Sequence, residues 1–387
     1  MSLFRTDPRA RRLSVLAASA LLLAACSDGS GEDTATSGTT SSGPLAAKVA
    51  QLEQSGDSYP VPTGQLPGLD GVAGTTVYYV PITQQAPQFA VTEAALADAF
   101  GKVGVKLQTC NGNATPTGIA ACLTQATKAR AGAIITDAVP YVLAANAFDA
   151  AIAAGIPVLN TNQSPDDAHP AAGKLGYIYA AGAEMMVAAA DWIINDSGGK
   201  ADVIINQSTD GPSPVAYVAA AKAEFARECP GCTVTINEIS SANFSLIPSS
   251  TSSALLKNPN AGYVVSEFDQ YLQPTLGGVQ QAGRIAAVKG VSGAAQLAGL
   301  QMLSKKNFLY ASVGQASAYQ GWADADAVLR MLTGTGGDAL AEYTIPIRLF
   351  TRDNIGTVEL TAGAEASGEW FGPSDYTTAF LTLWGVG

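Results

Sequence analysis

Residues 132–161 read GAIITDAVPYVLAANAFDAAIAAGIPVLNT and contain two apolar runs around a segment of helical length. The first run, AIIT, precedes the alanine-rich segment VLAANAFDAAIAAG, and the second run, IPVLNT, follows it. Strands that are apolar throughout and separated by helices are typical of a parallel sheet that helices cover on both faces. The stretch therefore predicts a strand–helix–strand unit of an α/β protein.

The same alternation continues in both directions along the chain. Before residue 132, the runs TTVYYVP and VKLQTC predict strands that are each followed by a helix. A second series begins with the helix AEMMVAAADWIIND, includes strands at 233–239 and 285–290, and ends with the strand YTIPIRLFT. Two such series predict an α/β protein of two doubly wound parallel-sheet lobes. Ligands of these sheets bind at the carboxyl ends of the strands, so the expected ligand site is a cleft between facing lobes.

The chain begins with the features of an export signal. Four arginines precede the apolar run LSVLAASALLLAA (13–25), which is shorter than the roughly 20 residues of a membrane-spanning helix. Residues 23–26 resemble the lipobox of bacterial lipoproteins. This resemblance implies that Cys26 receives a lipid, which anchors the protein to the cell membrane on its outer side. The alternative is a plain secreted protein with an incidental cysteine.

A polar linker is expected after Cys26. Residues 27–44 are rich in Ser, Thr and Gly, so they cannot bury enough apolar surface to offset the entropy of ordering. PLAAKVAQLEQ is interpreted as a short helix, and the prolines of YPVPTGQLPGLDG block regular structure. We predict a signal peptide over 1–25, and a lipidated cysteine with a flexible tether over 26–73.

The four remaining cysteines form two pairs in the sequence. Disulfides persist in exported proteins, and we predict one between Cys110 and Cys122. Cys229 and Cys232 bracket Pro-Gly, and they are either a redox pair or a staple of a turn. A redox pair normally opens a helix after a strand, whereas this motif follows a predicted helix and precedes a strand, so the staple is favoured.

Composition and motifs argue against nucleic-acid binding and against an enzyme. The net charge is −11 and no basic cluster occurs, which excludes the usual electrostatic footprint of a nucleic-acid binder. His169 is the single histidine, so a Ser-His-Asp triad or a histidine-rich zinc site lacks parts. GTGG at 334–337 follows a predicted helix and is interpreted as a helix end, not a phosphate loop. We expect no metal and no cofactor.

Over residues 74–355 the chain resembles the type I periplasmic binding proteins of the ribose-binding and LacI-like sugar-binding kind. The motifs that carry the resemblance are YYVPITQQAPQF, GAIITDAVP, AGIPVLNTNQ, LYASVGQ and QGWADADAVLRML. It implies a three-strand hinge, with crossings near Ala180, Gln315 and Thr344. The implied parts are lobe 1 over 74–180 and 316–343, lobe 2 over 181–315 and 344–360, and a C-terminal tail over 361–387 that packs on a lobe.

The resemblance also implies ligand contacts. Asn162 and Gln163 stand where sugar-binding members carry an Asp-Arg pair, and Ser292 stands where they carry an Asp. Gln315 matches a family glutamine at the hinge, and Tyr217 is the nearest candidate for a position that holds an arginine. The other matching positions are Gln85, Gln88, Phe89, Phe244, Phe268 and Asp269. Phe89 has the alternative role of a core residue at a helix start.

Two further candidates follow the predicted strand GAIIT. Asp137 and Tyr141 are placed to line the same face, with a helix N-cap and core packing as their respective alternatives. A cleft with many amides and aromatics and few charges favours a neutral solute such as a sugar, polyol, nucleoside or small aromatic compound.

The expected function is capture of such a solute by a monomer that delivers it to the permease subunits of an ABC importer. The alternative is a sensory module for a membrane receptor.

Overall fold

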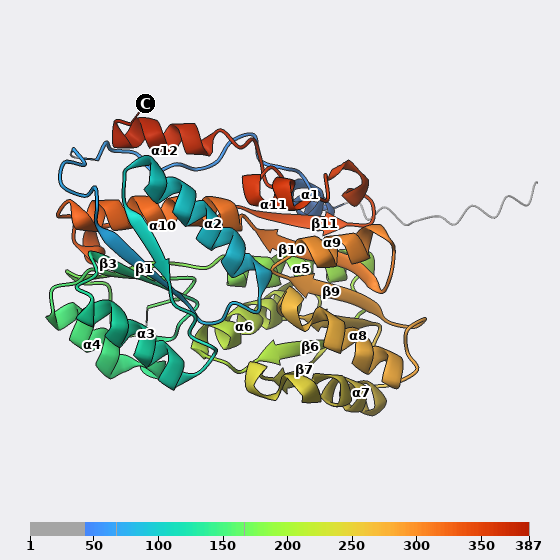
Figure 1. The fold of residues 1–387 in the computed structure, drawn as a ribbon. Helices are drawn as coiled ribbons and strands as arrows, with labels where there is room; N and C mark the ends of the chain where they lie inside the picture. The colour runs from blue at the N-terminus through green and yellow to red at the C-terminus, as the bar shows by residue number, and fades with distance from the viewer. Residues whose placement is uncertain (1–42, 67, 166, 387) are drawn as a thin grey trace, which may run out of the picture. The chain divides into compact units, whose positions relative to one another are not determined.

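The computed structural model describes residues 43–66, 68–165 and 167–386. The predicted signal peptide, Cys26 and the first part of the predicted tether lie outside these residues. None of the helices within the described ranges is both long and apolar enough to span a membrane. The described chain is built around two β-sheets with helices on their faces, as Figure 1 shows, which confirms the predicted α/β class.

The first sheet and its helices are called lobe 1 here. The sheet has five parallel strands in the order β2-β1-β3-β4-β5. The strands are β1 Thr76–Pro81, β2 Lys106–Thr109, β3 Ala133–Asp137, β4 Val158–Thr161 and β5 Leu175–Ile178. The helices are α2 Pro87–Lys102, α3 Pro116–Lys128, α4 Ala145–Ala153 and α10 Ser317–Leu332, with the short helix η1 Tyr141–Leu143 before α4. β1, β3 and β4 are buried almost along their whole length, as expected for strands that helices cover on both faces. β3 and β4 begin with apolar residues, and each ends in two polar residues at its carboxyl end.

The second sheet and its helices are called lobe 2. The sheet has six strands in the order β11-β10-β9-β8-β6-β7. The strands are β6 Asp202–Ser208, β7 Thr233–Ile239, β8 Tyr263–Ser266, β9 Lys289–Gly293, β10 Leu309–Gln315 and β11 Ile347–Thr351. The helices are α5 Gly182–Asp196, α6 Pro212–Glu228, α7 Ile247–Lys257, α8 Leu272–Gln281 and α9 Leu297–Ser304, and the short helices are η2 Ser241–Leu246, η3 Asp269–Tyr271 and η5 Ile355–Thr357. The short helix η4 Gly337–Ala339 lies against β5 of lobe 1.

Three details of the sheets differ from the sequence prediction. β11 runs antiparallel to β10, so the second sheet is mixed and not wholly parallel. The strand expected at 285–290 begins only at Lys289, because residues 284–287 form a turn and Ile285 is exposed. β5 was not predicted: its four residues follow a long loop and pair with β4 alone.

The N-terminal segment from Gly43 onward packs on the two lobes. Helix α1 (Pro44–Leu52) lies against α5, where Lys48 Nζ pairs with Asp191 Oδ2 at 2.7 Å. Further on, the ring of Tyr59 stacks on Tyr319 of α10. The predicted flexible tether over 26–73 is therefore wrong for its described part, because apolar side chains that the prediction treated as linker are buried in the cores. These side chains are Val49, Tyr59, Leu66 and Val72.

The C-terminal segment packs on both lobes, since its last helices contact α10 of lobe 1 while Trp370 and Phe371 contact Phe350 of β11 in lobe 2. Helices α11 (Ala362–Ser367) and α12 (Tyr376–Trp384) contact α10, and Figure 1 shows α12 running along it. The Trp384 ring stacks on Trp322 with centroids 5.5 Å apart, and its Nε1 donates to Asp326 Oδ1 at 2.7 Å. These ring contacts account for the aromatic content of the last residues.

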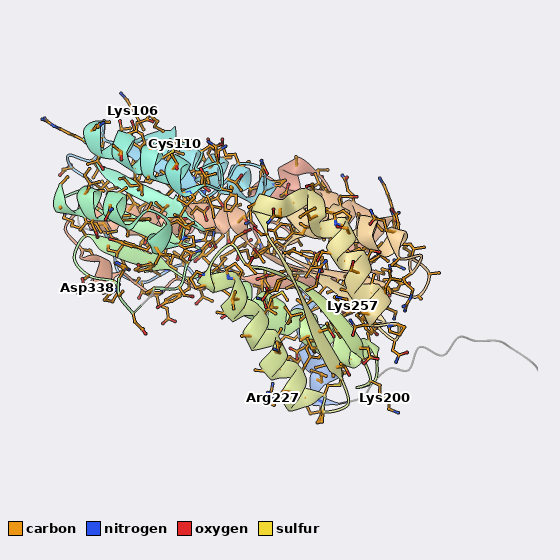
Figure 2. All side chains as sticks on the ribbon, turned by 90° about the horizontal axis from the view of Figure 1, so that it is seen from below. Lys106, Cys110, Lys200, Arg227, Lys257 and Asp338 are labelled. Carbon is orange, nitrogen blue, oxygen red and sulfur yellow. A yellow bond between two sulfur atoms is a disulfide. The ribbon has the colours of Figure 1, made fainter. Side chains whose placement is uncertain are left out.

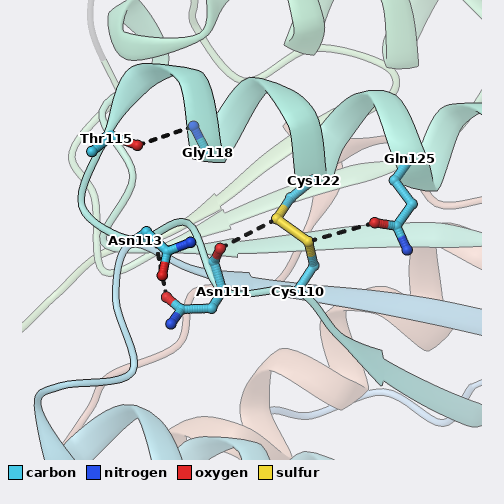
Figure 3. Close-up of a disulfide and its surroundings, with 7 residues drawn as sticks. All are labelled: Cys110, Asn111, Asn113, Thr115, Gly118, Cys122 and Gln125. Carbon is cyan, nitrogen blue, oxygen red and sulfur yellow. Dashed lines mark hydrogen bonds between the residues drawn. A yellow bond between two sulfur atoms is a disulfide. The ribbon is translucent and has the colours of Figure 1, made fainter.

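Both cysteine pairs form disulfides. Cys110, directly after β2, bonds to Cys122 on α3, which confirms the predicted bridge (Figure 3). Cys229 bonds to Cys232 across the turn between α6 and β7. The second disulfide fits the interpretation of CPGC as a staple between a helix and a strand.

Candidate ligand site between the lobes

A cavity opens where the carboxyl ends of the strands of both sheets meet. Its volume is about 180 Å³. Lobe 1 contributes residues that include Ile82, Thr83, Gln88, Phe89, Asn162 and Gln163. Lobe 2 contributes residues that include Met185, Ser208, Asp210, Tyr217, Phe268 and Tyr271, and Gln315 ends the strand β10 at the same place. This is the position at which doubly wound sheets bind their ligands.

Several loops that line the cavity carry backbone strain. Four lining residues adopt a positive φ of 52° to 57°, namely Ala114, Ala138, Asn162 and Ala294. The last three come directly after the ends of β3, β4 and β9. Positive φ is costly for residues other than glycine, and such residues gather at ligand sites because the surrounding structure holds them there. Asn is among the residues that tolerate this conformation best.

A chain of hydrogen bonds runs from the interior of lobe 1 to the cleft. Tyr79 Oη donates to Asp137 Oδ2 at 2.6 Å, and Asn162 Nδ2 donates to Asp137 Oδ1 at 2.7 Å. Gln315 Nε2 then donates to Asn162 Oδ1 at 3.1 Å. Burial raises the pKa of Asp137 to about 6, against the hydrogen bonds from Tyr79 and Asn162, which lower it. The two amides at the cleft are thus tied to a buried carboxyl group.

The two lobes touch each other across the cleft. Ser213 Oγ, at the start of α6, donates to Gln163 Oε1 at 3.0 Å. Gly211 lies so close to Pro140 that a Cβ atom on the glycine would stand 2.7 Å from Pro140 Cγ. Only a residue without a side chain fits there in this arrangement, so the structure has the lobes closed on one another.

Among the described residues that line the cavity, Asp210 is the single charged one. Its carboxylate accepts hydrogen bonds from Ser208, Ser240, Tyr271 and both the hydroxyl and the backbone N–H of Ser241. Burial raises the pKa of Asp210, but the hydrogen bonds from Ser241, Tyr271 and Ser240 outweigh it, and the pKa lies below its ordinary value. The charge is therefore held by the protein's own donors.

Other charged side chains lie outside the cavity lining, and several of them are exposed on the surface. Five charged residues that Figure 2 labels are exposed, namely Lys106, Lys200, Arg227, Lys257 and Asp338. No group of histidine, cysteine and acidic residues able to hold a metal ion occurs in the part of the chain that the structure describes. The cavity is lined by amides, hydroxyls and apolar rings, a set that suits a neutral solute.

The structure brings together part of the predicted site. The predicted residues that line the cavity are Gln88, Phe89, Asn162, Gln163, Tyr217, Phe268 and Gln315. Asp137 lies beneath the cavity wall, fully buried, and contacts Asn162. It is neither a helix N-cap nor a lining residue.

The other predicted residues lie elsewhere. Gln85 and Phe244 are exposed outside the cavity lining. Tyr141 packs in lobe 1, with its ring stacked on Phe148 and on His169. Ser292 is fully buried inside β9, because that strand begins later than predicted, and its hydroxyl donates to the buried carboxyl of Asp269 at 3.0 Å.

Sequence reasoning missed several lining residues of lobe 2. Ser208, Asp210 and Ser213 come from STDGPSP, the loop directly after the strand ADVIINQ. Their position at the carboxyl end of a strand was the available signal. Met185 and Tyr271 carry no such signal, because they reach the cavity from the first turn of α5 and from η3.

The fold and the cavity define a two-lobed solute-binding protein. The chain belongs to the periplasmic binding protein family, since the family model described as Periplasmic binding protein domain matches residues 77–336. The family consists of binding proteins and not enzymes, in agreement with the sequence prediction. A search of curated proteins finds no match.

Solved structures share the fold at low sequence identity. A 5-methylthioribose transporter solute-binding protein from Thermotoga lettingae has a TM-score of 0.67 and 18% identity, covering 82% of this chain and 99% of that one. A sugar ABC transporter protein from Yersinia enterocolitica has a TM-score of 0.66 and 18% identity, covering 84% and 98%. The myo-inositol-binding protein of Caulobacter has a TM-score of 0.64 and 19% identity, covering 77% and 97%.

Proposed function

We propose that this protein captures a small neutral solute, a sugar or a sugar-like compound, outside the cytoplasm and delivers it to the permease of an ABC importer. The observation that carries the proposal is the cavity between two contacting lobes. Among the described residues Asp210 is its single charged lining residue, and that carboxylate already accepts hydrogen bonds from the protein's own donors. Amides that offer both donors and acceptors suit hydroxyl groups. Closure around the solute requires that it bind the closed form better than the open form.

The structural neighbours support the choice of solute class. The Thermotoga protein was solved with 5-methylthioribose and the Caulobacter protein with myo-inositol. Both compounds are neutral and hydroxylated. We propose the same chemistry for the cavity of this chain.

We further propose that Cys26 carries the lipid anchor. The support is the run of apolar residues before Cys26 and the polar segment after it. Metabolic labelling with a fatty acid, followed by membrane fractionation, tests this part. We expect label and membrane association in the wild type and neither in Cys26→Ser. A labelled Cys26→Ser protein would overturn it.

A thermal-shift screen of residues 43–387 tests the solute class. The panel contains sugars, polyols, nucleosides, amino acids and aromatic acids. A solute at 100 times its dissociation constant stabilises the native state by about 2.7 kcal/mol, which such a screen detects easily. Hits among neutral sugars or polyols support the proposal. Hits confined to nucleosides or aromatic acids would replace the sugar assignment.

A further inference from the structure

In the hydrogen bonds that connect Asp137, Asn162 and Gln315, it is fixed which group donates and which accepts. An ionised carboxylate only accepts hydrogen bonds. Asn162 therefore turns its NH2 group toward Asp137 and its carbonyl oxygen toward Gln315. Gln315 can meet that oxygen only with its own NH2 group. Asp137 thus fixes the orientation of both amides, although it does not line the cavity itself.

The orientation of the two amides decides which of their atoms can bind a solute. Gln315 Oε1 is buried and has no hydrogen-bond partner among the residues that the structure describes. A buried acceptor without a partner is unfavourable, so a donor from a solute is favoured there. Gln163 differs, because its Oε1 accepts a hydrogen bond from Ser213 Oγ, so an acceptor of the solute can bind this side chain only at its NH2 group. An acceptor on Gln315 and a donor on Gln163 in the lining of one cavity match hydroxyl groups, which both donate and accept.

We propose that Asp137 is a positioning residue that sets the specificity of the cleft by holding Gln315 as a hydrogen-bond acceptor. A solute must then present a hydroxyl or N–H group at Gln315, and an acceptor-only group, such as a carboxylate or phosphate, is rejected. This inference rests on the proposed function, because it assumes that the cavity is the solute site. It narrows the solute to compounds with a hydrogen-bond donor at this end of the cavity.

The groups around Asp137 indicate how protonation of its carboxyl would release the orientation of the Asn162 and Gln315 amides. Tyr79 on β1 and Asn162 after β4 bond to it directly, and Asp324 on α10 lies within electrostatic range. Glu93 on α2 adds a negative charge near Tyr79. The pKa of Asp137 is raised to about 6, mainly by burial. Below this pH the protonated carboxyl can itself donate, so Asn162 no longer has one preferred orientation, and we expect discrimination to weaken.

Calorimetry with matched pairs of probes tests the inference. The pairs are D-ribose with D-ribonate, and myo-inositol with its monophosphate, each measured near pH 8 and near pH 5. At the higher pH the wild type is expected to prefer the neutral member roughly 100-fold, because the anionic member leaves the buried acceptor of Gln315 without a donor. In Asp137→Asn the preference is expected to fall at least about tenfold. An unchanged preference in a folded Asp137→Asn protein would overturn the proposal.

A measurement without any solute keeps the inference separate from the proposed function. The side-chain amide resonances of Asn162 and Gln315, assigned with Asn162→Asp and Gln315→Glu, should titrate in the wild type near the pKa of Asp137, about 6. Asp137→Asn should abolish this titration. Tyr79→Phe is nearly isosteric and removes a hydrogen bond to the ionised carboxylate, so it should move the midpoint to higher pH. Amide resonances that do not titrate would refute the role of Asp137.

The two experiments fail in different ways. If neither D-ribose nor myo-inositol binds while the amide resonances titrate as expected, the proposed solute class is wrong and the orientation by Asp137 stands. If a neutral solute binds but the resonances are insensitive to Asp137→Asn, the proposed function stands and this inference is wrong.

Discussion

Gly211 of lobe 2 and Pro140 of lobe 1 lie in direct contact across the cleft, with room for no Cβ atom on the glycine. Neither residue belongs to a regular element: Pro140 follows β3 and Gly211 precedes α6. Their contact exists because the two lobes are closed on one another. Both residues lie at the cavity lining, and a methyl group added at Gly211 would meet the ring of Pro140 first, so it disturbs closure of the lobes.

Gly211→Ala is expected to weaken solute binding while the lobes stay folded. Forcing a methyl group into a filled contact costs about 1–3 kcal/mol, which corresponds to a roughly 5- to 150-fold higher dissociation constant. The penalty applies to the closed form only, and the φ of Gly211 is extended, so alanine fits the backbone. Calorimetry with the best binder of the screen measures the effect.

Gly101→Ala is the matched control for this prediction. No atom lies within 4 Å of the Cβ position at Gly101, and the residue sits in helix α2, where alanine is favoured. Its dissociation constant should equal that of the wild type. If Gly211→Ala and Gly101→Ala bind the solute equally well, the solute-bound protein does not have Gly211 in contact with Pro140.

Gln315→Ala is expected to weaken binding by about 1–3 kcal/mol, because it removes a buried hydrogen-bonding group at the cleft. Asn162→Gly tests the neighbouring amide, and glycine is chosen because residue 162 has a positive φ that alanine would strain. Gln85→Ala is the control, since Gln85 is exposed and outside the cavity lining. Normal binding by both site variants would place the solute elsewhere.

Removing the disulfide between Cys110 and Cys122 is expected to lower the free energy of unfolding by about 3 kcal/mol. The bridge closes a loop with a sequence separation of 12, and a loop of this size restricts the unfolded chain by roughly that amount. Urea denaturation of the Cys110→Ser, Cys122→Ser protein measures the loss. The pair Cys229 and Cys232 closes a much shorter loop, so its removal should cost less. The reverse order would contradict the loop argument.

Asp269 should make stability depend on pH. Burial raises its pKa to about 7, against the hydrogen bonds from Ser292 and from the backbone of Gln296 and Gly299, which lower it. In the unfolded chain a carboxyl of this type loses its proton near pH 4. Between these values the native state holds a proton that the unfolded state has lost, so the free energy of unfolding falls as the pH rises.

Urea denaturation at several pH values between about 4 and 8 checks this dependence. Asp269→Asn should reduce the change in the free energy of unfolding over this pH range by an amount on the order of 4 kcal/mol. This holds whatever the effect of the substitution on stability at a single pH. Asp57→Asn serves as the control, because Asp57 is exposed. Identical curves for the wild type and Asp269→Asn would show that Asp269 keeps an ordinary pKa.

The fold was largely predictable because its signal is local. Most strands and helices were recognised from apolar runs, alanine-rich segments and glycine stops, and β7 matches its predicted range of 233–239. The predictions failed where tertiary contacts decide. Ile285 is apolar but lies in an exposed turn. Tyr59 stands in a proline-rich segment that looks like a linker, yet it is buried on Tyr319.

The site was predictable only in part. Residues at the carboxyl ends of strands, such as Asn162 and Gln315, follow from the order of elements. The supporting role of Asp137 does not follow from that order. A shift of one residue along the chain decides whether a side chain faces the cleft or lies beneath it, and the sequence does not fix this. Tyr271 and Met185 arrive from helices whose orientation the sequence leaves open.

By itself, the amino-acid sequence determined the α/β class, the two series of elements, the cysteine pairs and the low charge of the cleft. These features depend on the apolar pattern, the spacing and the composition of the chain, which are properties of the sequence alone. Only the tertiary structure decided the antiparallel β11, the burial of the N-terminal segment and the contact of Gly211 with Pro140. It also decided the direction of the hydrogen bonds from Asp137 to Gln315. These features depend on contacts between residues far apart in sequence. Such contacts stabilise the protein only after the chain has folded and brought the residues together.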